Sequence, residues 1–334
     1  MTMSLNDKID AVITWVDGND PVHQAKRAQF LTNKRENARK DVAGETRFNQ
    51  VGEIYCCIAS ILRFAPWINK IYIVTDNQDP HVEDYIKIHF PDNKIPVEVV
   101  DHKVVFEGYE KHLPTFNSLA ITSVLWRIPG INERFILFND DVMLQRPVTP
   151  EDFYRDNKIV LYGRRWISVN ETRITLVLQT LMRCLVGKKA LLSFKKFMYN
   201  AARVTQSARF VRLDHTPHAF FKSVFSEFYA ANPQCLEDNV RHRFRNKEQY
   251  SAAELHHLLA VKQGRADVAL RKKCGVTLSP YMYDIEGLKR ELQKIADDAQ
   301  CLYFCVNSLD QSSPEHIDIV NAWMRNVLSL KAEA

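Results

Sequence analysis

Short hydrophobic runs separated by helical patterns recur through the first half of the chain. Residues 53–64 and 116–126 place apolar side chains at helical spacing, and a proline follows each pattern. Four apolar runs rich in β-branched residues have the length of buried strands, at residues 9–16, 71–75, 97–100 and 135–138. Strands that alternate with helices predict an α/β region with a mostly parallel sheet and helices on both faces, over residues 1–162.

The pattern changes in the second half. Residues 171–210 read as helical and basic, and residues 214–262 join a His/Arg-rich stretch to a further helical pattern. The tail combines a strand-like run at 302–306 with a helical pattern at 314–328. Because no Ser/Gly linker separates the halves, we predict that a mainly helical region, residues 163–334, packs against the α/β region.

Charge is distributed unevenly. The chain carries 45 Lys and Arg against 40 Asp and Glu, a net charge of +5. Residues 163–212 hold eleven Lys or Arg and one acid, so that segment carries +10 and the remainder −5. Such asymmetry indicates an anionic partner.

Glycine and cysteine exclude several classes of protein. The ten glycines are dispersed, and no two lie within seven positions of each other. The dinucleotide fingerprint and the P-loop both need closely spaced glycines, so neither is present. The seven cysteines form no CxxC pair, which argues against a zinc site and favours a reduced, cytoplasmic protein. The N-terminus lacks an apolar signal segment, and no apolar run is long enough to cross a bilayer.

Acids and amides follow all four predicted strands, at residues 17–20, 76–79, 101–102 and 139–141. Parallel strands end at one edge of a sheet, and ligands bind beyond that edge. Any one of these groups could instead start a turn or cap a helix. Their convergence favours a site, and the pair Asp140 and Asp141 suits a hard cation, Mg²⁺ or Mn²⁺, that would neutralise a diphosphate.

Two further clusters carry candidate chemistry. Residues 212–218 hold His215 and His218 beside Arg and Pro, and a histidine of ordinary pKa near 6.5 can accept a proton from a sugar hydroxyl. Residues 241–245 alternate arginine with His and Phe. This second cluster is either a solvated basic face or a set of guanidinium groups that bind phosphate.

Long segments of the chain resemble the Stealth family of sugar-phosphate transferases. Residues 9–21 (IDAVITWVDGNDP) are similar to its first conserved region, and residues 47–80 and 112–154 to its second. Residues 214–225 and 242–260 match the third region more loosely, and residues 304–310 (FCVNSLD) match the fourth. In the fourth region Ser308 follows Asn307, where the family usually has Asp, and Asp310 is a possible substitute for that acid.

The resemblance implies a function. The family includes bacterial capsule polymerases and the catalytic subunit of the N-acetylglucosamine-1-phosphotransferase that acts on lysosomal enzymes. It implies transfer of a hexose or N-acetylhexosamine 1-phosphate from a nucleotide sugar, usually UDP-linked, to a sugar hydroxyl, with UMP released. The product would be a phosphodiester-linked capsular polysaccharide or exopolysaccharide. A Rossmann-like, GT-A-like fold and a divalent metal are also implied.

The resemblance assigns roles to particular residues. Asp140, His215 and Arg245 are the expected catalytic residues, and Asp17 is carried over more weakly. We expect His215 to accept the acceptor's proton, with Asp17 as the alternative base. The metal would bind Asp140, Asp141 and Asn307. Contacts to the nucleotide are expected from the residues near the strand ends, namely Trp15, Arg47, Asp76 and Asn139. Trp15 could equally belong to the core.

Alternatives remain at this stage. The runner-up is a metal-dependent GT-A glycosyltransferase that releases UDP. A nucleic-acid-binding protein is disfavoured because the basic stretch lacks interleaved aromatic repeats and any recognised binding motif, and because the strand-end acids would repel phosphate. That stretch, residues 163–212, would hold an anionic polysaccharide acceptor, rest on anionic lipid, or form a solvated face, and we favour the polymer. The expected location is cytoplasmic, with peripheral contact at the inner membrane or the capsule export machinery.

Overall fold

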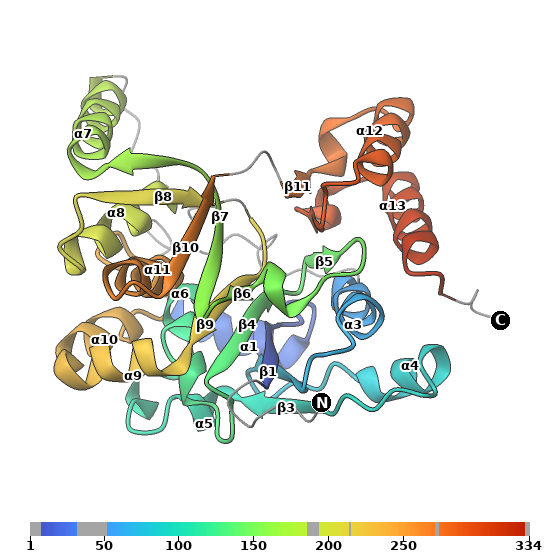
Figure 1. Cartoon of the computed structure of the whole chain (residues 1–334), viewed down its shortest axis with the longest axis horizontal. Helices are drawn as coiled ribbons and strands as arrows, with labels where there is room; N and C mark the ends of the chain where they lie inside the picture. Colours follow the sequence, from blue (N-terminus) through green and yellow to red (C-terminus); the bar gives the residue numbers. More distant parts are fainter. Residues whose placement is uncertain (1–7, 32–51, 186–193, 214, 271–273, 331–334) are drawn as a thin grey trace.

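A five-stranded sheet lies at the centre of the protein (Figure 1). The computed structural model describes residues 8–31, 52–185, 194–213, 215–270 and 274–330. The strand order is β3-β2-β1-β4-β9, in which the first four strands are parallel and β9 is antiparallel to β4. The bounds are β1 Ile9–Thr14, β2 Lys70–Thr75, β3 Val97–Asp101, β4 Arg134–Asn139 and β9 His218–Phe221. Since 3-2-1-4 is the order of the first four strands of a Rossmann sheet, the predicted Rossmann-like α/β class is confirmed.

Side chains of β1 alternate between two apolar cores. Ile9, Ala11 and Ile13 join the core under α3 (Glu53–Phe64), whereas Val12 faces the opposite core. This alternation follows from the two-residue period of a strand. The opposite face is covered by α5 His102–Val105, α6 Ser118–Thr122, α9 Lys222–Ala231, α10 Pro233–Val240 and α11 Ala252–Lys262. Helices therefore cover both faces, as predicted.

Two smaller sheets flank the central one. The first has the order β10-β7-β6, and β8 also pairs with β7. The second has the order β11-β12-β5 and packs on α3. Their bounds are β5 Val142–Leu144, β6 Tyr154–Arg155, β7 Lys158–Ser168, β8 Arg209–Leu213, β10 Ala266–Leu270, β11 Gly275–Leu278 and β12 Tyr303–Val306.

Further helices lie at the periphery. Figure 1 shows α7 standing out from the body at one end, and α12 and α13 at the other. No helix in the described part of the chain combines the length and the apolar character needed to cross a membrane. The bounds are α1 Pro21–Phe30, α4 Val82–His89, α7 Val169–Leu185, α8 Phe194–Val204, α12 Ile285–Asp297 and α13 Pro314–Val327.

The second half contains more strand than its sequence pattern indicated. The predicted strand at 302–306 and helix at 314–328 are found as β12 and α13. The patterns did not indicate β8, β9, β10 and β11, which are only four or five residues long. Since β9 completes the central sheet, the two halves share one sheet, and the boundary expected at residue 162 falls inside β7.

The single helix predicted over residues 116–126 is wrong. The structure has a short α6 followed by a 3₁₀ turn, η4 Leu125–Arg127. Asn117 caps α6 by accepting a hydrogen bond from the Leu119 N–H. At the other end the Trp126 indole N–H donates to the Ser123 carbonyl oxygen at 2.9 Å. That side-chain bond takes an acceptor that a continuing helix would use, so the chain tightens instead.

The Tyr154 hydroxyl provides a test of how the flanking sheet is held to the central one. This buried group lies 2.8 Å from the carbonyl oxygens of Phe135 on β4 and Phe220 on β9. Tyr154→Phe should lower the free energy of unfolding by about 1–3 kcal/mol, because it leaves buried acceptors unpaired. Chemical denaturation measures the change. Tyr281→Phe, at a 45% exposed position, is the control, and an equal loss in both variants would contradict this account.

Candidate functional site

A cavity of about 600 Å³ opens at the carboxyl edge of β1, β2 and β4. The parallel pairing of these strands brings their ends to one edge, as the sequence predicted. A cavity of this size is in the range of small-molecule and cofactor sites. Eight of the residues singled out from the sequence line it, namely Trp15, Asp76, Asn139, Asp140, Asp141, His215, Arg245 and Asn307.

Asp17 is a predicted site residue that does not line this cavity. The Asp17 carboxylate accepts a hydrogen bond from the Asn19 N–H at 2.9 Å and holds the turn after β1. Arg47 lies outside the described residues. Asp101, another strand-end acid, caps α5 by accepting from the Lys103 N–H. Turn and cap formation therefore accounts for the observed contacts of these two carboxylates.

Carboxylates crowd the end of β4. Asp140 and Asp141 form the turn between β4 and β5, and Glu53 at the start of α3 also lines the cavity. Burial raises the pKa of Asp140 well above its ordinary value, and the negative charges of Asp141 and Glu53 raise it further. Asp141 Oδ1 is shielded from solvent and accepts no hydrogen bond from the described residues. Such a cluster is stabilised by a cation.

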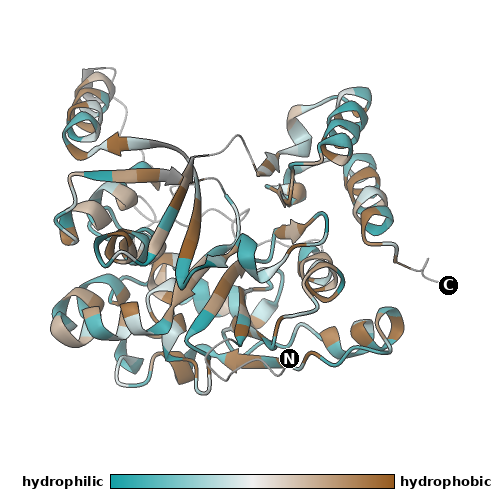
Figure 2. Ribbon diagram, in the orientation of Figure 1, coloured by the Kyte–Doolittle hydropathy of each residue, from teal (hydrophilic) through white to brown (hydrophobic). Residues whose placement is uncertain are grey.

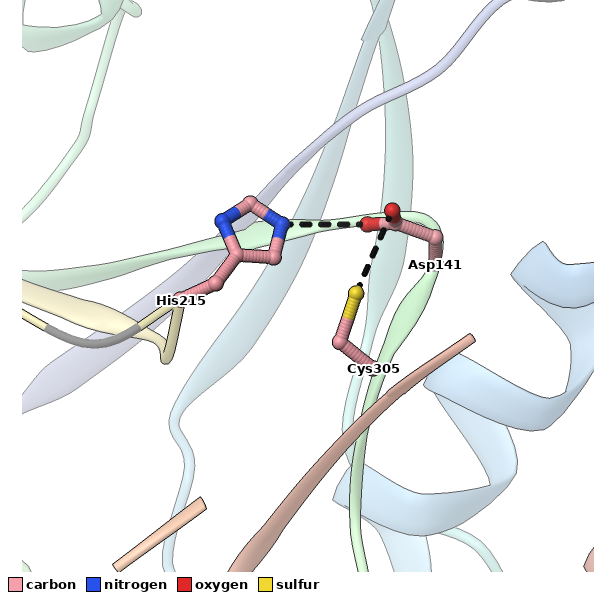
Figure 3. A group of neighbouring side chains, drawn as sticks. All are labelled: Asp141, His215 and Cys305. Atoms are coloured by element: carbon pink, nitrogen blue, oxygen red, sulfur yellow. Dashed lines mark hydrogen bonds and ion pairs between the residues drawn. The ribbon is translucent and has the colours of Figure 1, made fainter. Parts of the chain in front are cut away.

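Asp141 faces a histidine on one side and a cysteine on the other (Figure 3). Its Oδ1 lies 3.7 Å from His215 Nε2, and the Cys305 thiol donates to its Oδ2 at 3.4 Å. Desolvation lowers the pKa of His215, but the nearby Asp141 carboxylate outweighs it, so the net shift is upward. The His215 side chain is 44% exposed, which leaves it accessible to a substrate.

Both protonation states of His215 have a partner. Its Nε2 lies 3.2 Å from Asn139 Nδ2 as well as 3.7 Å from Asp141 Oδ1. A neutral ring with its proton on Nδ1 accepts from the Asn139 amide, and a protonated ring is attracted to Asp141. Protonation at Nε2 therefore exchanges the Asn139 hydrogen bond for attraction to Asp141.

Strand β12 holds the far wall of the cavity. The Val306 N–H donates to the Asp141 carbonyl oxygen at 3.0 Å, and Cys305 pairs with Val142 of β5. Asn307 follows directly, and its side-chain amide donates to Ser279 Oγ at 3.2 Å. Residues more than 160 positions apart thus meet across the turn after β4.

The β2 and β3 side of the cavity is aromatic and mostly neutral. Trp15 is buried in the core under α3 and lines the cavity at the same time, so both sequence interpretations of it are compatible with its position. The Lys26 ammonium bonds Asp76 Oδ2 at 2.8 Å. Burial lowers the pKa of His102 to about 4, despite the nearby charges of Asp76 and Asp101. His102 is therefore a neutral imidazole at neutral pH.

Arginine also lines the cavity. Arg245 Nη2 donates to Ser118 Oγ at 2.7 Å. Arg245 also lines a second cavity of about 360 Å³ formed by Phe30 and residues 241–246. There, Arg243 donates to the carbonyl oxygens of Lys111 and Leu113 and packs over the Phe30 ring at 4.6 Å. Because these partners are neutral, they position the positive charge of Arg243 without cancelling it.

Three lining or neighbouring residues were missed from the sequence, namely Glu53, Ser118 and Cys305. Glu53 and Ser118 look like ordinary residues at helix starts, and no local pattern distinguishes them. Cys305 lies in the segment FCVNSLD that resembles the fourth Stealth region. Its position two residues before Asn307 was the available signal.

The fold and this edge define an α/β enzyme whose polar side chains act beyond the carboxyl ends of parallel strands. Two family regions match the chain, "Stealth protein CR1, conserved region 1" over residues 7–35 and "Stealth protein CR2, conserved region 2" over residues 47–161. The chain belongs to the Stealth family. The resemblance noted from the sequence motifs is therefore confirmed.

Relatives of known name support the same assignment. The exopolysaccharide phosphotransferase cps2G of Lactiplantibacillus plantarum is 30% identical over 72% of this chain and 71% of its own length. The capsular polysaccharide phosphotransferase cps1A of Actinobacillus pleuropneumoniae is 36% identical over 45% of this chain and 39% of its own. An exopolysaccharide phosphotransferase of Streptomyces coelicolor is 30% identical over 92% and 52%. The predicted enzyme class, a transferase of phosphorus-containing groups, is confirmed.

The alignments set the limits of this comparison. This chain spans less than two thirds of the length of the Actinobacillus and Streptomyces relatives. Among solved structures, mouse xyloside xylosyltransferase 1 superposes with a TM-score of 0.41 at 9% identity, over 90% of this chain and 98% of that one. The fold assignment rests on the sheet topology instead.

Proposed function

We propose that the protein transfers a hexose or N-acetylhexosamine 1-phosphate from a UDP-sugar to a hydroxyl of a polysaccharide acceptor. A bond forms between the acceptor oxygen and the sugar-bound phosphorus. The bond between that phosphorus and the bridging oxygen of the diphosphate breaks. UMP leaves with the electron pair of that bond, and the product is a phosphodiester. One observation carries the proposal, namely that Asp140, Asp141, His215 and Arg245 line one cavity.

The arrangement suits phosphoryl transfer. The transition state spreads negative charge over the phosphoryl oxygens, so catalysis needs fixed positive charge and positioning more than covalent chemistry. Arg245 supplies a guanidinium fork at the cavity wall. Its bond to Ser118 fixes one end of the fork while the side chain remains at the cavity surface.

The residues after β4 fit a divalent cation. The shielded oxygen of Asp141 and the crowding of Asp140 by Glu53 are the observations that support this fit. Asp140 and Asp141 would hold the ion, with Asn307 across from them on the segment after β12. Mg²⁺ or Mn²⁺ bound there would neutralise the diphosphate and the leaving phosphate.

His215 is the proposed general base. It takes the acceptor proton on Nε2, and the Asp141 carboxylate then stabilises the imidazolium at 3.7 Å. Asn139 holds the neutral ring beforehand at 3.2 Å. The carboxylate of Asp17, the alternative base, accepts a hydrogen bond from the Asn19 N–H, and Asp17 does not line the cavity. These contacts favour His215.

The donor and the acceptor would occupy opposite ends of the cavity. Trp15 and His102 offer an aromatic face and a neutral imidazole for the nucleoside on the β2 and β3 side, where Lys26 pairs with the Asp76 carboxylate. The second cavity, with Arg243 and Arg245, offers fixed positive charge for an anionic acceptor chain. Arg245 lines both cavities, so the reacting phosphate would lie between them.

We also propose that α7 contacts an anionic membrane surface. Its exposed apolar side chains recur at the spacing of one helix face, as Ile174, Val177, Leu178, Leu181 and Met182, each more than half exposed. The helix stands out from the body, and Figure 2 shows brown, apolar residues on it. An apolar stripe within a segment of charge +10 favours lipid over the polysaccharide that we preferred for this segment from its sequence.

The products of turnover test the proposed reaction. Incubation with UDP-sugars, Mg²⁺ and an oligosaccharide acceptor should release UMP and produce a phosphodiester signal in phosphorus NMR. A chelator should abolish turnover, and added Mg²⁺ or Mn²⁺ should restore it. Release of UDP without a phosphodiester would instead establish the alternative, a GT-A glycosyltransferase.

His215→Ala should lose turnover by roughly 10²–10⁴-fold while donor affinity stays close to that of the wild type, because a general base acts in the chemical step. Single-turnover kinetics and calorimetric titration with the donor measure the two quantities. His81→Ala, at an 82% exposed side chain, is the matched control. Near-wild-type turnover in His215→Ala would rule out this base.

Membrane contact through α7 is tested with vesicles. The wild type should bind phosphatidylglycerol vesicles. The double variant Leu178→Glu, Leu181→Glu should bind at least about 10-fold more weakly, because two leucines that would be buried in the lipid are lost. Ile88→Glu, at another exposed apolar position on α4, is the control. Equal binding by wild type and double variant, or none by either, would refute the contact.

A further inference from the structure

Three ligand atoms of different chemistry meet beside the cavity (Figure 3). They are a carboxylate oxygen of Asp141, Nε2 of His215 and Sγ of Cys305, and all lie within 4.8 Å of one another. Asp141 is 3.4 Å from the sulfur and 3.7 Å from the imidazole nitrogen. Around a tetrahedral zinc ion, with bonds of about 2.0–2.3 Å, neighbouring ligand atoms lie roughly 3.3–3.8 Å apart. Two separations are of that size, one from Asp141 Oδ2 to the sulfur and one from Asp141 Oδ1 to the imidazole nitrogen, so each carboxylate oxygen faces one of the other two ligands.

The donor set differs from the one a hard cation needs. Mg²⁺ and Mn²⁺ prefer oxygen ligands, whereas sulfur and imidazole select softer ions such as zinc. A thiol and an imidazole on either side of one carboxylate are not the oxygen ligands that magnesium prefers. We propose that Asp141, His215 and Cys305 form a second site, sharing Asp141 with the proposed magnesium site, for a borderline-soft divalent cation of the zinc class, with its fourth position open to the cavity.

The surrounding fold holds two of the ligands rigidly. Cys305 lies on β12, which pairs with β5, and the Val306 N–H bonds the Asp141 carbonyl oxygen at 3.0 Å. The Cys305 side chain is buried, so its sulfur is fixed toward Asp141. His215 lies in the segment between β8 and β9 and completes the site from the open side. The missing CxxC pair, which argued against a zinc site, did not exclude this one, because its ligands come from three distant segments.

Metal binding would change the protonation of the site. Bonds form from the metal to Sγ, Nε2 and a carboxylate oxygen, and the Cys305 thiol releases its proton to the buffer. Any proton held by His215 on Nε2 is released as well. The ion would then occupy Asp141, a proposed magnesium ligand, and His215, the proposed base. The further consequence, which rests on the proposed function, is inhibition of turnover by zinc in the presence of magnesium.

Cobalt is a suitable probe because it replaces zinc and reports its ligands by absorption. Metal-free wild-type protein titrated with Co²⁺ should show a thiolate-to-cobalt charge-transfer band that saturates at one equivalent and disappears when Zn²⁺ is added. Cys305→Ser and Cys305→Ala should lose this band and bind Co²⁺ at least about 100-fold more weakly, since loss of a supporting group outside the ligand shell alone costs 10–100-fold. The two variants together guard against a folding failure in either one, and circular dichroism checks both.

Two other buried cysteines provide matched controls. Cys301→Ser removes a thiol that bonds the Tyr303 carbonyl oxygen away from the triad and should leave the cobalt band intact. Cys57 Sγ lies 3.6 Å from the Asn139 carbonyl oxygen, under the same turn. A band that survives Cys305→Ser but is lost in Cys57→Ser would overturn the assignment. The absence of any charge-transfer band in the wild type would overturn it as well.

Turnover assays separate this inference from the proposed function. With excess Mg²⁺, the Zn²⁺ concentration for half-inhibition should rise at least about 100-fold in Cys305→Ser, each protein being compared with its own zinc-free rate. A cobalt band without turnover of any nucleotide sugar would leave the metal site standing and remove the proposed reaction. Turnover without a cobalt band would refute the metal site and leave the proposed reaction standing.

Discussion

Parallel pairing of β1 with β4 determines where chemistry can occur in this protein. The register aligns Ile13 with Phe138 and Thr14 with Asn139, so both strands end at the same level. Trp15 therefore leaves the sheet beside the turn that carries Asp140 and Asp141. The apolar side chains that hold this register belong to two separate cores, one on each face of the sheet. The geometry of the cavity thus depends on burial far from it, through the hydrophobic effect on both faces.

A second constraint is electrostatic. Glu53, Asp140 and Asp141 lie together at the end of β4, and their mutual repulsion with burial raises the pKa of Asp140 well above its ordinary value. Buried like charges cost stability unless a cation or proton compensates them. A site with this cost in the free protein fits the proposed divalent cation. Arg245 places a positive charge at the same cavity, and His215 lines it as well.

The sequence predicted the central strands well because β1 to β4 each contain a short, mainly apolar segment with β-branched residues. It did not predict β8 to β11, which are short and whose pairing depends on partners far along the chain. The same limit applies to the site. Asp17 and Asp140 both follow a buried strand, yet one carboxylate bonds the next turn and the other lines the cavity. Only the path of the chain after each strand distinguishes them, and no local pattern records that path. The roles of Asp140, His215 and Arg245 came from family resemblance, and the structure places all three in one cavity.

Cys305 shows how one side chain can serve two states of the same site. Burial raises the pKa of its thiol well above the ordinary value, and the charges of Asp141 and Asp140 add to the shift. Without a soft metal the group is therefore a neutral S–H donor that holds Asp141 Oδ2 and leaves Oδ1 turned toward His215. The contact that orients Asp141 for its proposed hard cation is thus the contact that places sulfur next to oxygen and nitrogen. A serine there could keep the hydrogen bond to Asp141 but would remove the soft ligand, so the chemistry of sulfur, and not the geometry alone, is what makes the second metal site possible.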